Sequence, residues 1–213
     1  MIKRISALAL AAAMALSLVA CGGGDSKPAE TPSTNTPAAS TPATAPSGEA
    51  AGLTEAFAEV PALVTSGGQS ADYQMIGTVM GKVGMDYTIN NLATSADLGA
   101  AKTLIVVVGG SSKGLGAAGI DADQELARVA ELIDGAKSAG LSVIVMHTGG
   151  EARRGDLSDK FITPIFEKAD YAIVVTAGDE DGLMAGICAG KGIPMDGIAS
   201  ISEVTTVLPA AFK

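Results

Sequence analysis

Runs of consecutive aliphatic and β-branched residues constrain the fold of this 213-residue chain more strongly than any other feature. The clearest run spans residues 102–108 and contains Thr-Leu-Ile-Val-Val-Val without a polar residue at alternate positions. Such a run is typical of a strand buried on both faces of a sheet. Segments with helical spacing of apolar residues separate the runs, and parallel strands need crossovers of that kind. The chain is therefore predicted to form an α/β domain.

The expected elements alternate along the chain from residue 60 onward. Strands are predicted at residues 60–65, 85–89, 102–108, 141–146 and 171–176, with a short edge strand at 198–201. Helices are predicted at residues 71–83, 121–139, 157–168, 181–189 and 203–212. Together they indicate a three-layer, mostly parallel sheet of five or six strands, flavodoxin-like or Rossmann-like, with strand order 2-1-3-4-5. This order makes the loops after strands one, three and four neighbours at the carboxyl edge, where such folds bind ligands.

The longest predicted helix has recognisable signals at both ends. Asp121 and Gln124 form a capping box, in which each side chain accepts a backbone hydrogen bond from the other residue. Gly140 ends the helix because glycine readily adopts the left-handed conformation at a helix C-terminus. No helix is expected between the strand at 102–108 and Asp121, because glycine dominates that segment.

The first of the three loops is rich in glycine and hydroxyl groups and directly precedes a helix. Glycines allow close approach of the backbone, and the start of a helix presents free N–H groups, so this loop is predicted to cradle an anion. The alternative is a plain Gly-Gly turn with Ser70 as the N-cap. The candidate ligand-binding residues here are Ser66, Gly67, Gly68, Gln69 and Ser70.

The second loop matches two nucleotide-binding patterns poorly. A dinucleotide fingerprint at Gly114, Gly116 and Gly119 begins several residues beyond the strand instead of at its tip. A short-chain dehydrogenase loop would require a Tyr-x-x-x-Lys pair, which the sequence lacks. No cofactor is therefore expected, and the loop is predicted to contact the ligand through Gly110, Ser111, Ser112 and Lys113.

The same loop suggests an enzymatic alternative. The segment at residues 110–114 fits Gly-x-Ser-x-Gly, the nucleophile elbow of α/β hydrolases. A small secreted hydrolase would then use Ser112 as the nucleophile and His147, the single histidine, as its base. A true elbow runs directly from strand to helix, whereas a glycine-rich stretch is expected to intervene here. No catalytic residue is assigned for this reason.

The third loop is the densest polar stretch of the domain. A guanidinium beside glycine amides suits a carboxylate or phosphate ligand. Adjacent arginines point in different directions, so only one of the two is expected to face a site; the alternative is that both pair with carboxylates of their own loop. No metal site is predicted, because there is no second histidine. The candidate residues are His147, Gly149, Gly150, Glu151, Arg153 and Arg154.

The first part of the chain has the pattern of a bacterial lipoprotein. Residues 1–20 combine a short positive region with an apolar run and end in Leu-Val-Ala, and Cys21 follows, as in a signal peptide with a lipobox. Cys21 is therefore the predicted site of lipidation, which would tether an extracytoplasmic protein to a membrane. Residues 21–52, rich in Pro, Thr, Ala and Ser, are predicted to form a disordered linker, and residues 53–213 a single α/β domain.

Two segments of the domain resemble a known family. Residues 109–121 and 149–159 are similar to bacterial lipoprotein domains described only as having unknown function, and the resemblance extends over residues 53–213. It implies an exported, membrane-tethered domain and supplies neither a ligand nor catalytic residues.

Composition narrows the function classes that remain. The net charge is −9 and only 3% of the residues are aromatic, which argues against a nucleic-acid partner. The leading hypothesis is a lipid-anchored domain that binds a small anionic solute for a membrane transporter or a sensor. The alternatives are the hydrolase and a protein-interaction module, in which the three loops would lie apart or be filled by their own side chains.

Overall fold

The computed structural model describes residues 50–213. The predicted signal peptide at residues 1–20, the lipidation site Cys21 and the predicted linker up to residue 49 lie outside the described residues.

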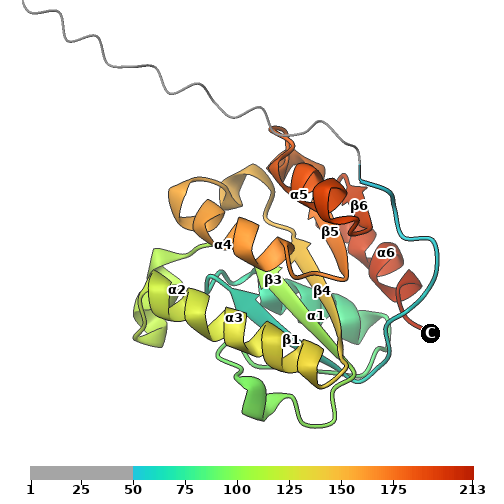
Figure 1. Cartoon of the computed structure of the whole chain (residues 1–213), viewed down its shortest axis with the longest axis horizontal. Coiled ribbons are helices and arrows are strands. Elements are labelled where there is room, and N and C mark those ends of the chain that lie inside the picture. Colours follow the sequence, from blue (N-terminus) through green and yellow to red (C-terminus); the bar gives the residue numbers. More distant parts are fainter. Residues whose placement is uncertain (1–49) are drawn as a thin grey trace, which may run out of the picture. The chain divides into compact units, whose positions relative to one another are not determined.

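A six-stranded parallel sheet forms the centre of the domain (Figure 1). Its strand order is β2-β1-β3-β4-β5-β6, which confirms the predicted α/β class and the predicted order 2-1-3-4-5, with one further strand at the edge. All five pairings are parallel. The strands are β1 (Ala62–Gly67), β2 (Tyr87–Ile89), β3 (Thr103–Val108), β4 (Ser142–His147), β5 (Tyr171–Val175) and β6 (Met195–Ile198).

Helices cover both faces of this sheet and produce three layers. One face packs against α3, α4 and α5, and the other against α1 and α6. Within residues 50–213, none of the helices is long and apolar enough to cross a membrane. The α-helices of this part are α1 (Asp72–Lys82), α2 (Ser112–Ala118), α3 (Ala122–Ser138), α4 (Asp156–Phe166), α5 (Leu183–Lys191) and α6 (Val204–Ala210). The 3-10 turns are η1 (Ser95–Asp97), η2 (Gly150–Arg153), η3 (Thr176–Gly178) and η4 (Ile201–Glu203).

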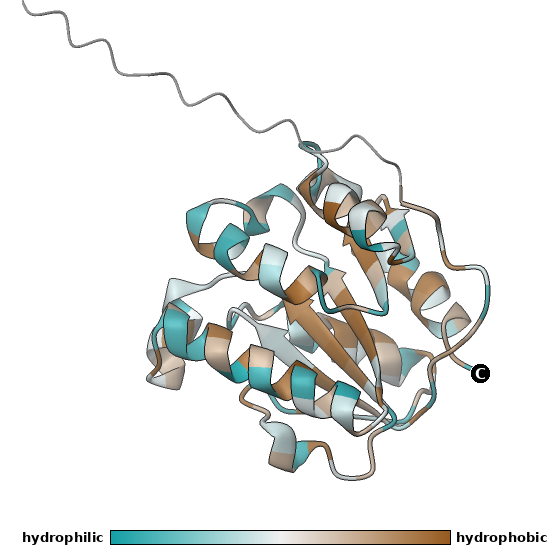
Figure 2. Ribbon diagram, viewed as in Figure 1, coloured by the Kyte–Doolittle hydropathy of each residue, from teal (hydrophilic) through white to brown (hydrophobic). Residues whose placement is uncertain are grey.

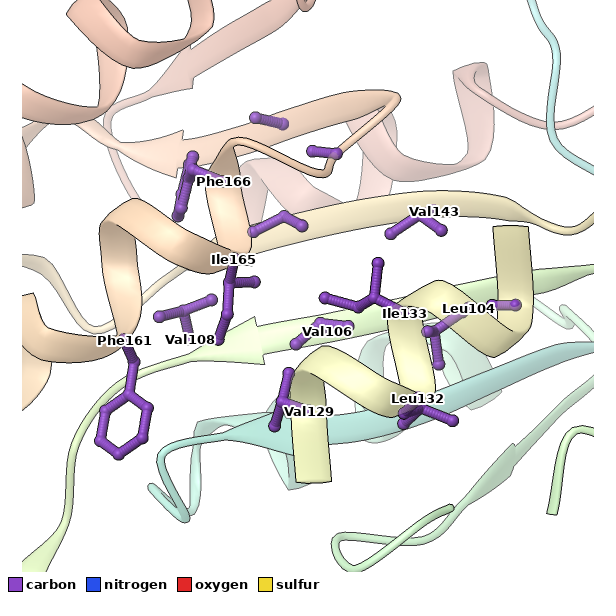
Figure 3. Packing of buried hydrophobic residues seen from close by; sticks show 14 of the residues in the cluster. Leu104, Val106, Val108, Val129, Leu132, Ile133, Val143, Phe161, Ile165 and Phe166 are labelled. Atoms are coloured by element: carbon purple, nitrogen blue, oxygen red, sulfur yellow. The ribbon is translucent and has the colours of Figure 1, made fainter. Parts of the chain in front are cut away.

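The central strands are apolar on both faces because both faces are covered. Along β3, Leu104 and Val106 contact the layer of α3 and α4, while Ile105 and Val107 contact the opposite layer. Figure 3 shows the first of these contacts, with Ile133 of α3 packed over β3. Figure 2 shows the same arrangement as hydrophobic strands enclosed by helices with hydrophilic outer surfaces. The absence of polar alternation in β3 follows from this double burial.

Two predictions about local structure were wrong. The last strand is β6, Met195–Ile198, whereas residues 201–203, at the end of the predicted strand, form a 3-10 turn. Helix α2 begins at Ser112, so a helix does follow β3 directly. Ser111 caps α2 by accepting a hydrogen bond from Gly114 N at 3.0 Å, and Gly119 ends it with a φ of 70°. These caps offset the low helix propensity of the glycines, which had hidden the helix.

The segment that enters the domain follows the outer edge of the sheet. Ala51 O accepts a hydrogen bond from Met195 N of β6 at 2.8 Å. Phe57 N and Ala58 N both donate to Ala211 O at 2.9 Å. Residues 50–52, placed in the linker by their composition, therefore contact β6.

Candidate functional site

The loops after β1, β3 and β4 meet at the carboxyl edge of the sheet. Ser70 N donates to Gly109 O at 3.1 Å, and Ser111 N donates to Gly68 O at 2.9 Å, so the first two loops pair as a short antiparallel bridge. Arg153 Nε donates to a carboxylate oxygen of Asp72 at 2.9 Å and joins the third loop to the start of α1. The three loops are thus not splayed apart, which is the first of the two arrangements expected of an interaction module.

The turn of the first loop encloses a carboxylate of the chain itself. Glu125 of α3 is fully buried, and its Oε1 accepts from Gly68 N at 2.9 Å and from Gln69 Nε2 at 3.1 Å. The turn needs positive φ angles of 112° at Gly68 and 61° at Gln69. The prediction that this loop cradles an external anion is wrong at this turn, because Glu125 already occupies the N–H of Gly68.

Arg128 neutralises this buried carboxylate. Its Nε lies 2.8 Å from Glu125 Oε2, while its Nη2 donates to Ser66 O at 2.6 Å and its Nη1 to Ala93 O at 2.7 Å. The pair therefore holds the end of β1 and the segment after β2 against α3. Neither residue was predicted from the sequence to belong to the site. The available signal was that Glu125 falls on the same helical face as the buried Val129 and Ile133.

The hydroxyl groups of the first loop also have partners within the protein. Ser66 Oγ donates to Ser70 O at 3.3 Å, and Ser70 Oγ donates to Asp72 at 3.1 Å. Both serines are fully buried. The N-cap of α1 is Ala71, so the alternative prediction that Ser70 caps the helix is wrong as well.

A groove of about 550 Å³ lies beside these paired loops. Four of the predicted ligand-binding residues line it, namely Gln69, Ser111, Lys113 and Arg153. The other side chains of its wall were not predicted from the sequence and include Tyr73, Asn91, Leu92, Ala117 and Ala118. Gly114 shapes the floor: a Cβ at this position would overlap the carbonyl oxygen of Gln69. The close approach of α2 to the first loop thus depends on a glycine.

Two cations reach this groove from different loops. Lys113 is exposed on the first turn of α2, and the Arg153 side chain is 33% exposed. Within residues 50–213, the only ion-pair partner of Arg153 is Asp72, which bonds to Nε. Lys113 makes no ion pair with any residue of this part. Donors of both side chains thus remain available to a ligand.

Arg154 points into a different pocket. Its guanidinium bonds to Asp159 and Asp181 and donates to Gly178 O at 2.7 Å. The pairing raises the pKa of Arg154 and lowers the pKa of Asp181 to about 2. Glu151 lines the same pocket of about 320 Å³. The adjacent arginines diverge, as the sequence predicted, and the candidates Arg154 and Glu151 lie in this pocket and not in the groove with Arg153.

His147 lies beneath the third loop, not in the groove. Its ring is fully buried, and Nε2 lies 2.9 Å from Arg153 O. A carbonyl can only accept, so Nε2 carries the proton. Burial lowers the pKa of His147 and keeps the ring neutral. Nδ1 has no hydrogen-bond partner within the described part and packs against Gly178.

This geometry corrects the hydrolase alternative. Ser112 is exposed at the start of α2 and makes no hydrogen bond to His147, whose Nε2 is engaged by Arg153 O. A serine nucleophile needs its base within hydrogen-bond reach. The strand-to-helix turn of an elbow is present, but the base is not available.

The remaining candidates shape the backbone of the loops. Gly67 ends β1, and Gly110 N donates to Ser158 Oγ at 2.9 Å. Gly149 packs so closely on Arg153 that a Cβ would overlap its side chain, and Gly150 has a φ of 57°. Among residues 50–213, no group of three His, Cys, Asp or Glu side chains could hold a metal ion.

Comparison with known proteins places the chain in a family. No curated protein matches it in sequence. A crystal structure of TesA is similar at 16% identity over 49% of this chain and 70% of that chain, with a TM-score of 0.28, a likeness too weak to use. A family model described as Domain of unknown function (DUF6305) matches residues 59–212.

Proposed function

The chain belongs to the family described as Domain of unknown function (DUF6305), and from its carboxyl-edge groove we propose that it binds a small anionic solute. One observation carries this proposal: Lys113 and Arg153 reach a single groove from two loops while keeping donors free of intramolecular partners. An ammonium and a guanidinium form charge-assisted hydrogen bonds with carboxylate or phosphate oxygens.

The position of Arg153 is fixed before any ligand arrives. Asp72 holds its Nε, and the buried His147 donates to its backbone carbonyl. A side chain that is already ordered loses less conformational entropy on binding. Because Asp72 uses only Nε, the two Nη groups are oriented for an external anion.

Neutral hydrogen-bonding groups line the same groove as the two cations. Ser111 and Gln69 line the groove, and Gln69 is held by Asn91, whose Nδ2 donates to Gln69 Oε1 at 2.9 Å. Small-molecule sites commonly combine a few such fixed polar groups with a concave surface of this size.

The proposed setting is the outer face of a membrane. Residues 1–20 would act as the signal peptide, lipidated Cys21 as the anchor, and residues 22–49 as the spacer between membrane and domain. An anchored binding domain of this kind would pass its solute, or the signal of its binding, to a membrane transporter or sensor.

Titration calorimetry of the purified protein with inorganic phosphate and short carboxylates tests the binding proposal. We expect saturable binding that Arg153→Ala weakens at least tenfold, consistent with loss of a charge-assisted bidentate contact. Arg154→Ala is the matched control and should bind as the unmodified protein does. Absence of binding by any anion, or equal loss in both variants, would contradict the proposal.

Radiolabelled palmitate tests the membrane anchor separately. In bacteria that express the full chain, the label should enter the protein and the protein should sediment with membranes. Cys21→Ser should abolish both results. Unchanged labelling of this variant would refute lipidation at Cys21.

A further inference from the structure

The groove has both apolar and charged side chains in its walls. Leu92 and Tyr73 line it together with the small residues Ala117 and Ala118, whereas its charged donors are Lys113 and Arg153. Leu92 is 39% exposed and is one of only four large hydrophobic residues of the described part that are exposed. Apolar side chains that line a concave site together with a few charged donors favour a ligand with both an apolar and a charged part.

Strand order separates the apolar wall from the cation at Arg153. Leu92 follows β2 and Arg153 follows β4, and the order β2-β1-β3-β4 puts two strands between them. Neighbouring strands lie about 4.8 Å apart, so three steps of the sheet separate the two ends by about 14 Å. Gln69 and Tyr73 follow β1, between those ends.

The small residues of α2 leave room along the groove. Lys113 and Ala117 are one helical turn apart on the same face of α2. The ammonium group and the methyl group are therefore neighbours on this wall of the groove. Alanine at 117 and 118 widens the groove where a longer side chain would fill it. The opposite wall supplies Tyr73 of α1, an aromatic ring that is partly buried against the core.

We propose that the solute is an amphiphilic organic carboxylate, with its charged head at Arg153 and Lys113 and an apolar body extending toward Leu92. This inference rests on the proposed function and names the ligand class of the same groove. An inorganic anion would use the cations and leave the apolar wall exposed to water. An unbranched or aromatic acid would contact both ends, because the side chains of Arg153 and Leu92 both line the groove across strands about 14 Å apart.

A series of straight-chain carboxylates measures the apolar contribution. We expect titrations of the purified protein with acetate, butyrate, hexanoate and octanoate, each below its micelle concentration, to show affinity rising about two- to fourfold per methylene group. The upper value corresponds to full burial of each group. Octanamide, which keeps the body and lacks the charge, should bind at least tenfold more weakly than octanoate.

Two variants test whether Leu92 provides this apolar contribution to affinity. Leu92→Asn should reduce the gain between butyrate and octanoate and leave acetate binding unchanged. Met75→Asn is the matched control, because Met75 is 50% exposed on α1 and does not line the groove. Its affinities should equal those of the unmodified protein.

The outcomes distinguish this inference from the function on which it rests. If acetate and octanoate bind equally, in a manner that depends on Arg153, the groove takes small anions and the amphiphilic ligand is refuted. A chain-length dependence that is undiminished in Leu92→Asn also refutes it, since the apolar contact then lies elsewhere. If no carboxylate or phosphate binds, the proposed function itself fails.

Discussion

Consecutive arginines in the loop after β4 have different environments. Arg153 lines the groove beside β1 and β3 and has one carboxylate partner, Asp72, at Nε. Arg154 enters the pocket beside η3, where Asp159, Asp181 and the carbonyl of Gly178 engage its guanidinium. Both were equivalent candidates in the sequence. The difference teaches that a cation can serve a ligand only where the protein has left its donors unpaired.

The two pockets also differ in what supports them. The buried pair of Glu125 and Arg128 holds the loop on which the groove depends. The pocket of Arg154 is built from carboxylates that are partly exposed, with the Asp181 side chain 57% exposed. A buried pair is costly to break, whereas exposed ion pairs contribute little. Changes near the groove should therefore have the larger effects.

Removal of the buried Glu125 carboxylate should lower the free energy of unfolding more than any change in the pocket of Arg154. Glu125→Ala leaves Arg128 charged and buried and leaves the N–H of Gly68 without its acceptor. Loss of one partner of a buried pair costs about 3–5 kcal/mol. We expect a decrease of this size in the free energy of unfolding, measured by urea denaturation. Asp181→Asn serves as the comparison in the other pocket, and an equal decrease there would contradict the stated difference.

A methyl group at the floor of the groove should have the next largest effect. In Gly114→Ala the added Cβ would overlap Gln69 O and push α2 away from the first loop. Overpacking of this kind costs about 1–3 kcal/mol. Gly116→Ala on the same helix is the control, because a Cβ there meets nothing within 4 Å. The control should be stabilised by up to about 1 kcal/mol, and thermal denaturation of the two variants should shift in opposite directions.

Truncation of Arg154 should have a smaller effect. Arg154→Ala removes two ion pairs whose acidic partners are 36% and 57% exposed, so we expect about 1 kcal/mol or less in the free energy of unfolding. Affinity for phosphate or carboxylates should not change. A loss of affinity equal to that of Arg153→Ala would show that the two pockets act as one site.

The smallest expected effect is a pH dependence at Asp181. Arg154 lowers the pKa of this carboxyl from 3.8 to about 2, so the folded state favours the charged form. Its stabilising contribution is complete above pH 4 and is lost as the pH falls from about 4 to about 2. Because Asp181 is largely exposed, the change should stay below about 1 kcal/mol. Other carboxyl groups titrate in the same range, so urea denaturation at several pH values should show a loss that is smaller by this amount in Asp181→Asn than in the unmodified protein.

The fold could be predicted because its signals are local or periodic. Apolar runs without alternation indicated the buried strands, and the capping box of Asp121 and Gln124 is present at the start of α3. The glycines that hid α2 show the limit of such signals. Propensity disfavoured a helix there, and the caps at Ser111 and Gly119 together with packing on Gln69 overcame it.

The site was only partly predictable from the sequence. Parallel topology placed the loops after β1, β3 and β4 at one edge, and Gln69, Ser111, Lys113 and Arg153 line its groove. The sequence did not indicate that Glu125 of α3 would occupy the first loop, since the hydrogen bond from Gly68 joins residues 57 positions apart. It also could not distinguish Arg153 from Arg154.

The sequence by itself determined the parallel α/β sheet and the edge at which its polar loops meet, because strand burial and helix caps depend on neighbouring residues. Only the tertiary structure decided which charges remain available at that edge. Asp72 and Arg153 lie 81 positions apart, and their pairing depends on how α1 and the loop after β4 pack over the same strands. Whether two charged side chains pair depends on their distance in the folded chain, and the order of residues does not give that distance directly.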